Sequence, residues 1–347
     1  MTGAETIVQV LADEGVDTIF GYSGGAILPT YDAVFTFNQD EQRTGRHGLP
    51  LIVAANEQGA AFMAAGYARA SGKVGVCMVT SGPGATNTLT PVRDCMADSV
   101  PIVVICGQVP TSAIGTDAFQ EAPVPSIMGA VAKHVFLVTD PAKLEATVRT
   151  AFEIARTGRP GPVVIDVPKN VQNWSGPFDG AARLAVPGYR QRLARVDEAS
   201  LAPEKCDELL AALAQSQRPL LYVGGGVIAG EAAASLREFA SGLGIPAVTT
   251  LMGIGAVDTT DAQVLTSGGQ VIQAFYSSSN GGYTERSDYV FSATLPYLVA
   301  TPDPLDQATG KYMTVCPLYE RMPGPPKGRR CSIWAPCTPT PATGRPR

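Results

Sequence analysis

The sequence predicts an α/β protein built around a doubly wound parallel sheet, followed by a partial second α/β domain and an irregular C-terminal tail. Three observations support this fold class. Short, continuous apolar runs recur along the first half of the chain, helix-length segments separate them, and glycine-rich turns follow several of the runs directly. Continuous apolar strands that alternate with helices are typical of a parallel sheet covered on both faces.

The first domain is expected over residues 1–175. Its predicted strands are the five apolar runs at 18–21, 51–54, 74–80, 101–107 and 162–168. Its predicted helices have amphipathic or small-residue patterns and cover Glu5–Asp13, Glu57–Ala70, Ala85–Asp98 and Pro141–Arg156. Residues 176–200 are polar and contain glycine and proline, so we expect an interdomain linker there.

A second α/β domain is expected over residues 201–265, and its pattern is incomplete. The predicted elements are a helix at Pro203–Ala214, a strand at 219–226, a helix at Glu231–Gly242 and a strand at 245–251. Two strands are few for a doubly wound domain, so this domain is predicted to be truncated. Residues 266–310 lack helical periodicity, and residues 311–347 combine Pro, Arg, Thr, Gly and Cys in a composition typical of a disordered tail.

Composition excludes several classes of function. The 347 residues carry a formal net charge of −5, which argues against nucleic acid or an anionic membrane as the main partner. No apolar stretch reaches the roughly 18 residues that span a bilayer, and the first residues do not resemble a secretory signal. The seven cysteines form no CxxC pair and only two histidines are present, so neither a disulfide framework nor a metal site is predicted. We expect a cytoplasmic protein.

The residues that could carry chemistry cluster in turns after predicted strands. Glu57 opens a helix, and the other segments are GYSGGAILPTYDA, TSGPGATN and GTDAFQE. Ligands of open α/β sheets bind outside the carboxyl ends of the strands. Each motif also has a purely structural interpretation, because a first-turn glutamate complements the helix dipole and a glycine-rich turn is often only a tight connection. No Walker motif is present, and GGGVIAG misses the GxGxxG spacing by one residue.

Taken together, in this order and at this spacing, the motifs resemble the pyrimidine-binding domain of acetolactate synthase large subunits, which are thiamine-diphosphate enzymes. The resemblance covers about residues 1–175 and rests on GYSGGAILPTYDA, NEQGAAFMAAGYARASGKVGVCMVTSGPGATN, DSVPIVVICGQVP, GTDAFQE and ARTGRPGPVVIDVPK. It continues more loosely through RPLLYVGGG and TTLMGIGAV, which are similar to the central domain of the family.

The resemblance implies a definite chemistry. Thiamine diphosphate acts as an electron sink, and pyruvate is decarboxylated and joined to a second 2-keto acid in branched-chain amino-acid biosynthesis. Glu57 falls on the position of the catalytic glutamate, which hydrogen-bonds a nitrogen of the cofactor's pyrimidine ring. The other positions implied at the cofactor are Gly25, Ala26, Pro83 and Asn87. Two residues depart from the family pattern next to this site: Ser23 stands where proline is usual, and Asn56 stands where histidine is common.

Two further sets of residues carry over from the family. The positions that match the lining of the substrate channel are Phe119, Gln120 and Lys169. The positions that match contacts to a structural FAD are Arg159, Gly224, Gly225, Gly226, Leu251 and Met252.

The family holds magnesium and the diphosphate through a GDG motif and a later pair of asparagines, and neither occurs in this sequence. The resemblance therefore implies that the chain binds only the pyrimidine half of the cofactor, lacks the magnesium ligands and is inactive alone. Because the family pairs its pyrimidine domains, we expect a homodimer or association with an intact large subunit. The expected interface lies near Ala60–Ala68 and Thr86–Met96.

Residues 268–306 resemble a different family, the SpoIID/LytB sporulation and cell-wall proteins, which suggests a fused or frame-disrupted coding sequence. Two alternative functions stay open. The chain could belong to another thiamine-diphosphate carboligase or decarboxylase, or it could be a non-catalytic binding or decoy protein.

Overall fold

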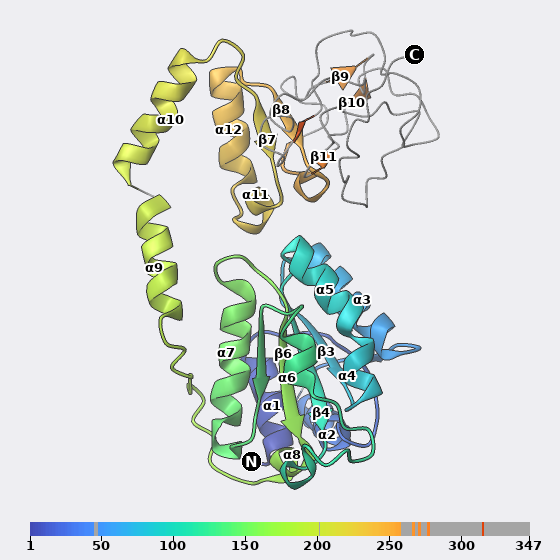
Figure 1. The fold of residues 1–347 in the computed structure, drawn as a ribbon. Coiled ribbons are helices and arrows are strands. Elements are labelled where there is room, and N and C mark those ends of the chain that lie inside the picture. Colours follow the sequence, from blue (N-terminus) through green and yellow to red (C-terminus); the bar gives the residue numbers. More distant parts are fainter. Residues whose placement is uncertain are drawn as a thin grey trace, which may run out of the picture. The chain divides into compact units, whose positions relative to one another are not determined.

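The computed structural model describes residues 1–44, 48–200 and 202–257, together with the backbone of four two-residue strands. Those strands are β9 (Thr266–Ser267), β10 (Gln270–Val271), β11 (Tyr276–Ser277) and β12 (Thr314–Val315). The chain divides into two compact units, Met1–Asp207 and Glu208–Arg347 (Figure 1). The segment at 268–306 that resembles SpoIID/LytB proteins and the predicted tail at 311–347 otherwise lie outside the described residues.

The first unit contains a six-stranded sheet with the order β2-β1-β3-β4-β6-β5, in which every pairing is parallel. Its strands are β1 (Ile19–Tyr22), β2 (Leu51–Val53), β3 (Gly75–Val79), β4 (Ile102–Gln108), β5 (His134–Leu137) and β6 (Val163–Pro168). The winding direction reverses at β1, because β2 lies on one side of it and β3 on the other. The predicted doubly wound sheet is confirmed, and ligands of such sheets bind where the strand order reverses.

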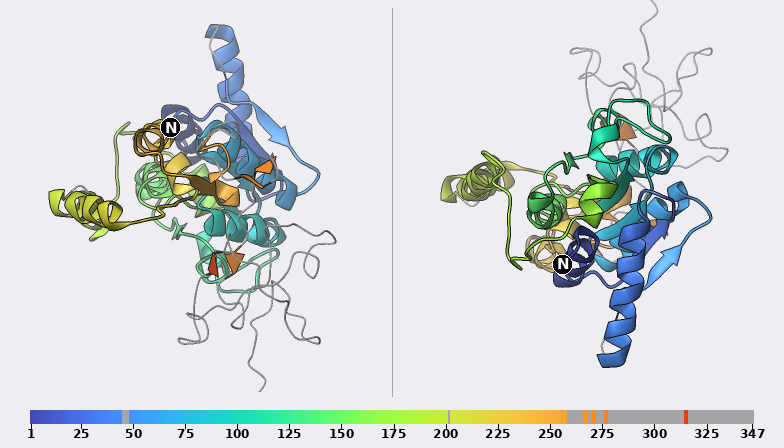
Figure 2. Two further views of the ribbon diagram at one scale, coloured as in Figure 1. Left: turned by 90° about the horizontal axis from the view of Figure 1, so that it is seen from above. Right: turned by 90° about the horizontal axis from the view of Figure 1, so that it is seen from below.

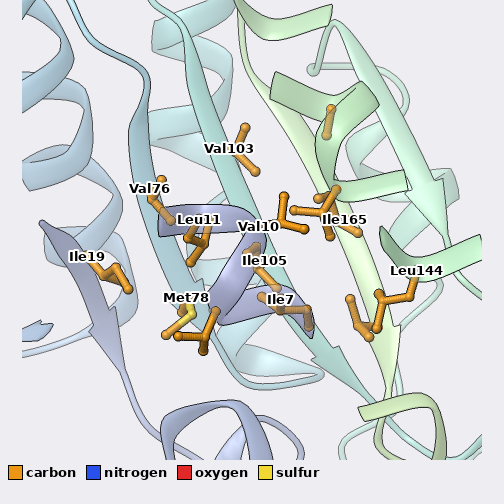
Figure 3. Packing of buried hydrophobic residues seen from close by; sticks show 14 of the residues in the cluster. Ile7, Val10, Leu11, Ile19, Val76, Met78, Val103, Ile105, Leu144 and Ile165 are labelled. Carbon is orange, nitrogen blue, oxygen red and sulfur yellow. The ribbon is translucent and has the colours of Figure 1, made fainter. Parts of the chain in front are cut away.

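Helices cover both faces of this sheet (Figure 2). One face carries α1 (Gly3–Asp13), α2 (Leu28–Thr44), α7 (Leu144–Arg156) and α8 (Lys169–Asn173); the other carries α3 (Glu57–Ser71), α4 (Pro83–Asn87), α5 (Leu89–Asp98) and α6 (Val124–Met128). Figure 3 shows Ile7 and Leu11 of α1 packed over Met78 and Ile105 of the sheet. Because both faces are covered, the central strands are apolar throughout.

The small-residue face of α3 packs inside the unit. Its five buried alanines belong to the core between α3 and the sheet: Ala60, Ala61, Ala64, Ala65 and Ala68. These alanines pack against the sheet and are not themselves exposed, and the interface expected near Ala60–Ala68 stays a prediction. The large apolar residues that α3 leaves exposed are Phe62 and Met63.

The prediction of one continuous helix at Ala85–Asp98 is wrong, because the structure has two helices, α4 and α5, that are separated at Thr88. The amide of Thr88 bonds the carbonyl of Ala85, three residues back, and closes the first helix. Pro91 has no N–H to continue the ladder, so an unbroken helix would lose a hydrogen bond and meet a steric clash. The predicted helix at Pro141–Arg156 likewise starts as a 3₁₀ turn, and α7 begins at Leu144.

Thr2 caps the first helix. Its hydroxyl accepts a hydrogen bond from the amide of Glu5 at 3.1 Å, and the Glu5 carboxylate accepts one from the amide of Thr2 at 2.8 Å. This reciprocal pair is a capping box, and it fixes the start of a helix whose apolar face lies in the core.

Replacing Thr2 with alanine should lower the free energy of unfolding by about 1 kcal/mol, because the amide of Glu5 at the start of α1 loses its hydrogen-bond acceptor. The urea midpoint of purified protein measures this loss. Ser126→Ala, at an exposed position of α6, serves as the control and should leave the midpoint unchanged. Equal midpoints for the two variants would contradict the capping role.

The segment after β6 that is predicted as a linker is fastened to α7 over part of its length. The carboxylate of Glu145 accepts hydrogen bonds from the amides of Asp179 and Gly180, each at 2.8 Å, and from Nε of Arg149 at 3.0 Å. Arg149 is itself buried, with its guanidinium 5.5 Å from the ring centroid of Phe178. These contacts hold residues 178–180 on the surface of α7.

The later part of the same segment adds two more attachments. The amide of Leu184 donates to the hydroxyl of Thr150 at 3.0 Å, and Arg190 forms a bidentate ion pair with Glu153 at 2.7 and 2.6 Å. A further helix, α9 (Tyr189–Ser200), begins within this segment.

The second unit has a small parallel sheet of β7 (Leu221–Val223) and β8 (Ala247–Thr249). Its helices are α11 (Gly226–Ala229) and α12 (Ala233–Leu243), and α10 (Pro203–Gln215) begins before the unit boundary. The buried apolar residues of its core are Val223, Ala247, Ala256 and Val257. The two predicted strands and two predicted helices are confirmed, with shorter strands than expected. Within the described part of the chain, no helix combines the length and apolar character needed to cross a bilayer.

Candidate functional site

Three loops meet at the carboxyl ends of β1, β2 and β3, next to the reversal of strand order. The turn 23–27 follows β1, the loop 54–56 joins β2 to α3, and the loop 80–82 follows β3. The amide of Ala26 donates to the hydroxyl of Thr80 at 3.3 Å, so the turn after β1 lies against the end of β3.

Glu57 is the first residue of α3 and is only 8% exposed. The side chain of Asn56 caps the helix by accepting a hydrogen bond from the amide of Gly59 at 2.7 Å, which fixes where the helix starts. Charged side chains are rarely buried without partners. The amide of Asn87 supplies one, because its Nδ2 donates to Oε2 of Glu57 at 2.9 Å. Among the described residues, no hydrogen bond reaches the second oxygen, Oε1.

The helix α4 lies beside this carboxylate. It begins at Pro83 and ends at Asn87. Gly84 is so close to Glu57 that a Cβ atom added to it would lie 3.6 Å from Oε1. Burial, and to a smaller extent the Glu57 charge, raises the pKa of the Cys77 thiol. The structure therefore brings together Glu57, Asn87 and the start of α4, all of which are predicted cofactor positions.

The turn 23–27 crosses directly above the end of β4. A Cβ atom at Gly107 would lie 2.6 Å from the carbonyl oxygen of Ala26, so only glycine fits under the turn. The same carbonyl accepts a hydrogen bond from Nε2 of Gln172 at 2.7 Å. Within the turn, Ala26 is buried and Gly25 is exposed. No sequence motif predicted that Gly107 and Gln172 contact this turn.

The loop after β4 carries two of the predicted substrate residues. Gln120 has φ +57°, and its carbonyl oxygen lies 2.5 Å from where a Cβ atom of Gly82 would be, so its backbone adjoins the start of α4. The side chain of Phe119 is 88% exposed. The Glu121 carboxylate accepts hydrogen bonds from the amides of Gly115 and Ala118, and these backbone donors lower its pKa.

A buried polar pair lies beneath the same loop. Nε2 of Gln108 donates to the carbonyl of Ala122 and to Oδ2 of Asp166, both at 3.0 Å. Asp166 has no exposed surface, and no hydrogen-bond partner within the described residues reaches its Oδ1. Burial raises the pKa of Asp166 to about 7, although the hydrogen bond from Gln108 acts in the opposite direction.

The third predicted substrate residue, Lys169, is the first residue of α8 and is half-buried. Gln172 lies in the same short helix, so Lys169 is tied through the backbone of α8 to the turn 23–27. The structure thus places the backbone of Gln120 against the start of α4, and Lys169 in the helix that is bonded to the turn 23–27.

Arg159, predicted at a flavin, caps the end of α5 in this structure. Its Nε donates to the hydroxyl of Ser99 at 2.8 Å, and its Nη2 donates to the carbonyls of Met96 and Ala97 at 2.8 and 2.9 Å. The other residues predicted at a flavin belong to the second unit and follow its two strands: Gly224, Gly225, Gly226, Leu251 and Met252. Two of them touch, since a Cβ atom at Gly225 would lie 2.9 Å from that of Met252.

A doubly wound parallel sheet with a buried carboxylate and glycine-rich turns at its strand reversal is the arrangement in which α/β proteins commonly bind ligands. Comparison with known proteins identifies the family to which the chain belongs. Residues 1–128 match the family model described as thiamine pyrophosphate enzyme, N-terminal TPP binding domain. Residues 206–281 match the model described as thiamine pyrophosphate enzyme, central domain. The chain therefore belongs to the thiamine pyrophosphate enzyme family.

Its curated relatives are acetolactate synthase subunits. The chain is 44% identical to the acetolactate synthase large subunit of Corynebacterium glutamicum over 255 residues, which are 74% of this chain and 38% of the relative. It is 43% identical to the acetolactate synthase isozyme 2 large subunit of Escherichia coli over 258 residues, or 74% and 43% of the two chains. The large subunit of Parasynechococcus marenigrum is 47% identical over 264 residues, or 76% and 41%.

The chain spans about two fifths of the length of these relatives. The central-domain match runs to residue 281 and so overlaps the first part of the segment at 268–306 that resembles another family.

Proposed function

We propose that the first unit binds the aminopyrimidine ring of thiamine diphosphate through Glu57, and that the chain functions in acetolactate synthesis. One observation carries the proposal: Glu57 is buried at the strand reversal with one oxygen held by Asn87 and the other facing Gly84 without a partner among the described residues. A ring nitrogen is a suitable partner for that oxygen. When bound, thiamine diphosphate supplies an electron sink for carbon–carbon bond chemistry.

The residues of the chain have distinct roles in this proposal. Asn87 donates to Oε2 and so orients the carboxylate, which leaves Oε1 to share a proton with the ring nitrogen. Glu57 is only 8% exposed, and a hydrogen bond in such a poorly solvated place is stronger than one in open water. Gly25 and Ala26, in the turn above β4, and Pro83, at the start of α4, form the adjoining walls.

The family resemblance also suggests the substrates and a second cofactor. The proposed substrates are pyruvate and a second 2-keto acid, with Phe119, Gln120 and Lys169 along their path. A flavin at the strand ends of the second unit is supported by the grouping of residues 224–226 with Leu251 and Met252. The sequence holds no GDG motif and no paired asparagines, so we propose that magnesium and the diphosphate need ligands that these 347 residues do not supply.

We also propose that the chain pairs with a second copy or with an intact large subunit. Exposed apolar side chains on neighbouring elements support a partner here, namely Ile52 and Val53 of β2 and Phe62 and Met63 of α3. Such residues are uncommon together on a free surface. Co-purification with an intact large subunit would support the decoy alternative, and a homodimer by light scattering would support self-association.

The ligand assignment is tested with thiamine, which presents the pyrimidine ring without the diphosphate. Ligand-observed NMR titrations should show that the chain binds thiamine about tenfold or more tightly than an analogue with CH in place of the ring nitrogen, since a hydrogen bond to a charged group is lost. Equal affinities for the two compounds would rule out the proposed contact.

The purified chain should produce no acetolactate from pyruvate with added thiamine diphosphate and magnesium. The reason is that the GDG motif and the paired asparagines, whose oxygen atoms hold magnesium in the family, do not occur in this sequence. A colorimetric acetolactate assay measures this, with an intact acetolactate synthase run in parallel to prove the reagents. Turnover by the chain alone, at a rate above that of its Glu57→Gln variant, would refute this part of the proposal.

A further inference from the structure

Gln172 is a polar side chain with no exposed surface, in a helix of only five residues. Its Nε2 donates to the carbonyls of Ala26 at 2.7 Å and Val167 at 3.0 Å, and its Oε1 accepts from the hydroxyl of Thr30 at 2.9 Å. Both N–H groups and the oxygen are therefore in use. A buried amide is costly unless it is bonded in this way, so its placement depends on all three partners.

These hydrogen bonds join the turn 23–27 to the end of β6. Ala26 is held on both sides of its backbone, because its amide donates to Thr80 at the end of β3 and its carbonyl accepts from Gln172. The bond to Val167 anchors the Gln172 amide to a central strand of the sheet. The turn is thereby clamped between two strand ends.

The same helix also holds the loop after β4. Asn170 accepts from the amide of Thr111 at 2.9 Å and donates to its hydroxyl at 3.1 Å. Helix α8 therefore connects the loops after β1 and β4, while Lys169 stands at its first position.

We propose that Gln172 is a positioning residue for the cofactor site: its two donated hydrogen bonds keep the turn 23–27 in place beside the Glu57 cluster. The identity of the ligand in this statement rests on the proposed function, whereas the clamping of the turn does not.

The test compares Gln172→Met with Gln108→Met, because both glutamines are buried and both donate to the carbonyl of a loop at the strand ends. Amide hydrogen exchange is followed by NMR. In Gln172→Met, exchange at Ala26 and Ile27 should rise about tenfold or more relative to the β4 amides, since the turn loses its anchor. In Gln108→Met, the increase should appear at 118–122 and spare Ala26 and Ile27. Uniform acceleration across the sheet, or no change at the turn, would overturn the clamp.

Ligand binding supplies the second readout. Gln172→Met should bind thiamine about tenfold more weakly than the wild-type chain, and Gln108→Met should bind it nearly as well. If the wild-type chain binds no thiamine, the proposed function fails, and exchange alone still decides whether the turn is clamped. If thiamine binding is unchanged in Gln172→Met while exchange at the turn rises, the positioning role is refuted. Should Gln172→Met not fold, Thr30→Val removes only the hydroxyl that orients the amide and should accelerate exchange at Ala26 in the same direction.

Discussion

Replacing Glu57 with glutamine should weaken thiamine binding roughly tenfold, because a charge-assisted hydrogen bond to the ring nitrogen is replaced by a weaker one from a neutral amide. The fold should persist, since the amide oxygen of glutamine can still accept from Nδ2 of Asn87. The measurement is a ligand-observed NMR titration of thiamine, with the melting temperature recorded alongside.

The matched control is Glu204→Gln, because Glu204 also lies in the first turn of a helix but is exposed. It should leave thiamine affinity unchanged, which separates ligand contact from a general effect of the helix dipole. The analogue that lacks the ring nitrogen completes a cycle. It should bind the wild-type chain and Glu57→Gln equally weakly, and a full loss on mutation with that analogue would show that Glu57 acts elsewhere.

Replacing Asp166 with asparagine should stabilise the protein above pH 7 by up to about 4 kcal/mol, as a pKa raised by roughly three units implies. Burial raises the pKa of Asp166 from 3.8 to about 7. Between these values the unfolded chain ionises while the folded chain keeps its proton, so wild-type stability falls as pH rises from about 4 to about 7. Asparagine removes that loss, and below pH 4 the two proteins should be equally stable.

Urea midpoints at several pH values between 4 and 8 measure this difference. The control is Asp17→Asn, because the hydrogen bond from Lys73 lowers the pKa of Asp17 and moves its titration below that range. Its stability difference from wild type should therefore be constant from pH 5 to 8. A constant difference for Asp166→Asn as well would mean that this carboxyl is ionised in the folded protein.

The sheet could be predicted because its central strands are short, continuous apolar runs followed by turn residues, which is typical of buried parallel strands. Helix α2 was not predicted, since its second half reads NQDEQRT and has no apolar period. Strand β5 was missed because it is a four-residue, half-buried strand at the sheet edge.

The proximity of Glu57 and Asn87 could be predicted, because their short motifs follow parallel strands whose carboxyl ends lie at one edge of the sheet. Gln108 and Gln172 carry no such signal, because glutamine is usually exposed and its burial depends on carbonyls from distant loops. The hydrogen bonds of Arg159 to the end of α5 were not predictable from its sequence motif, and its contact with a flavin stays a prediction.

The hydrogen bonds from the amides of Asp179 and Gly180 to Glu145 have a practical consequence for expression of the first unit by itself. A recombinant fragment ending at residue 175, where the motifs stop, would strip Glu145 of these donors and Arg149 of the ring above it. Extending the fragment through Arg190 would retain the ion pair with Glu153 and keep the flank of α7 covered.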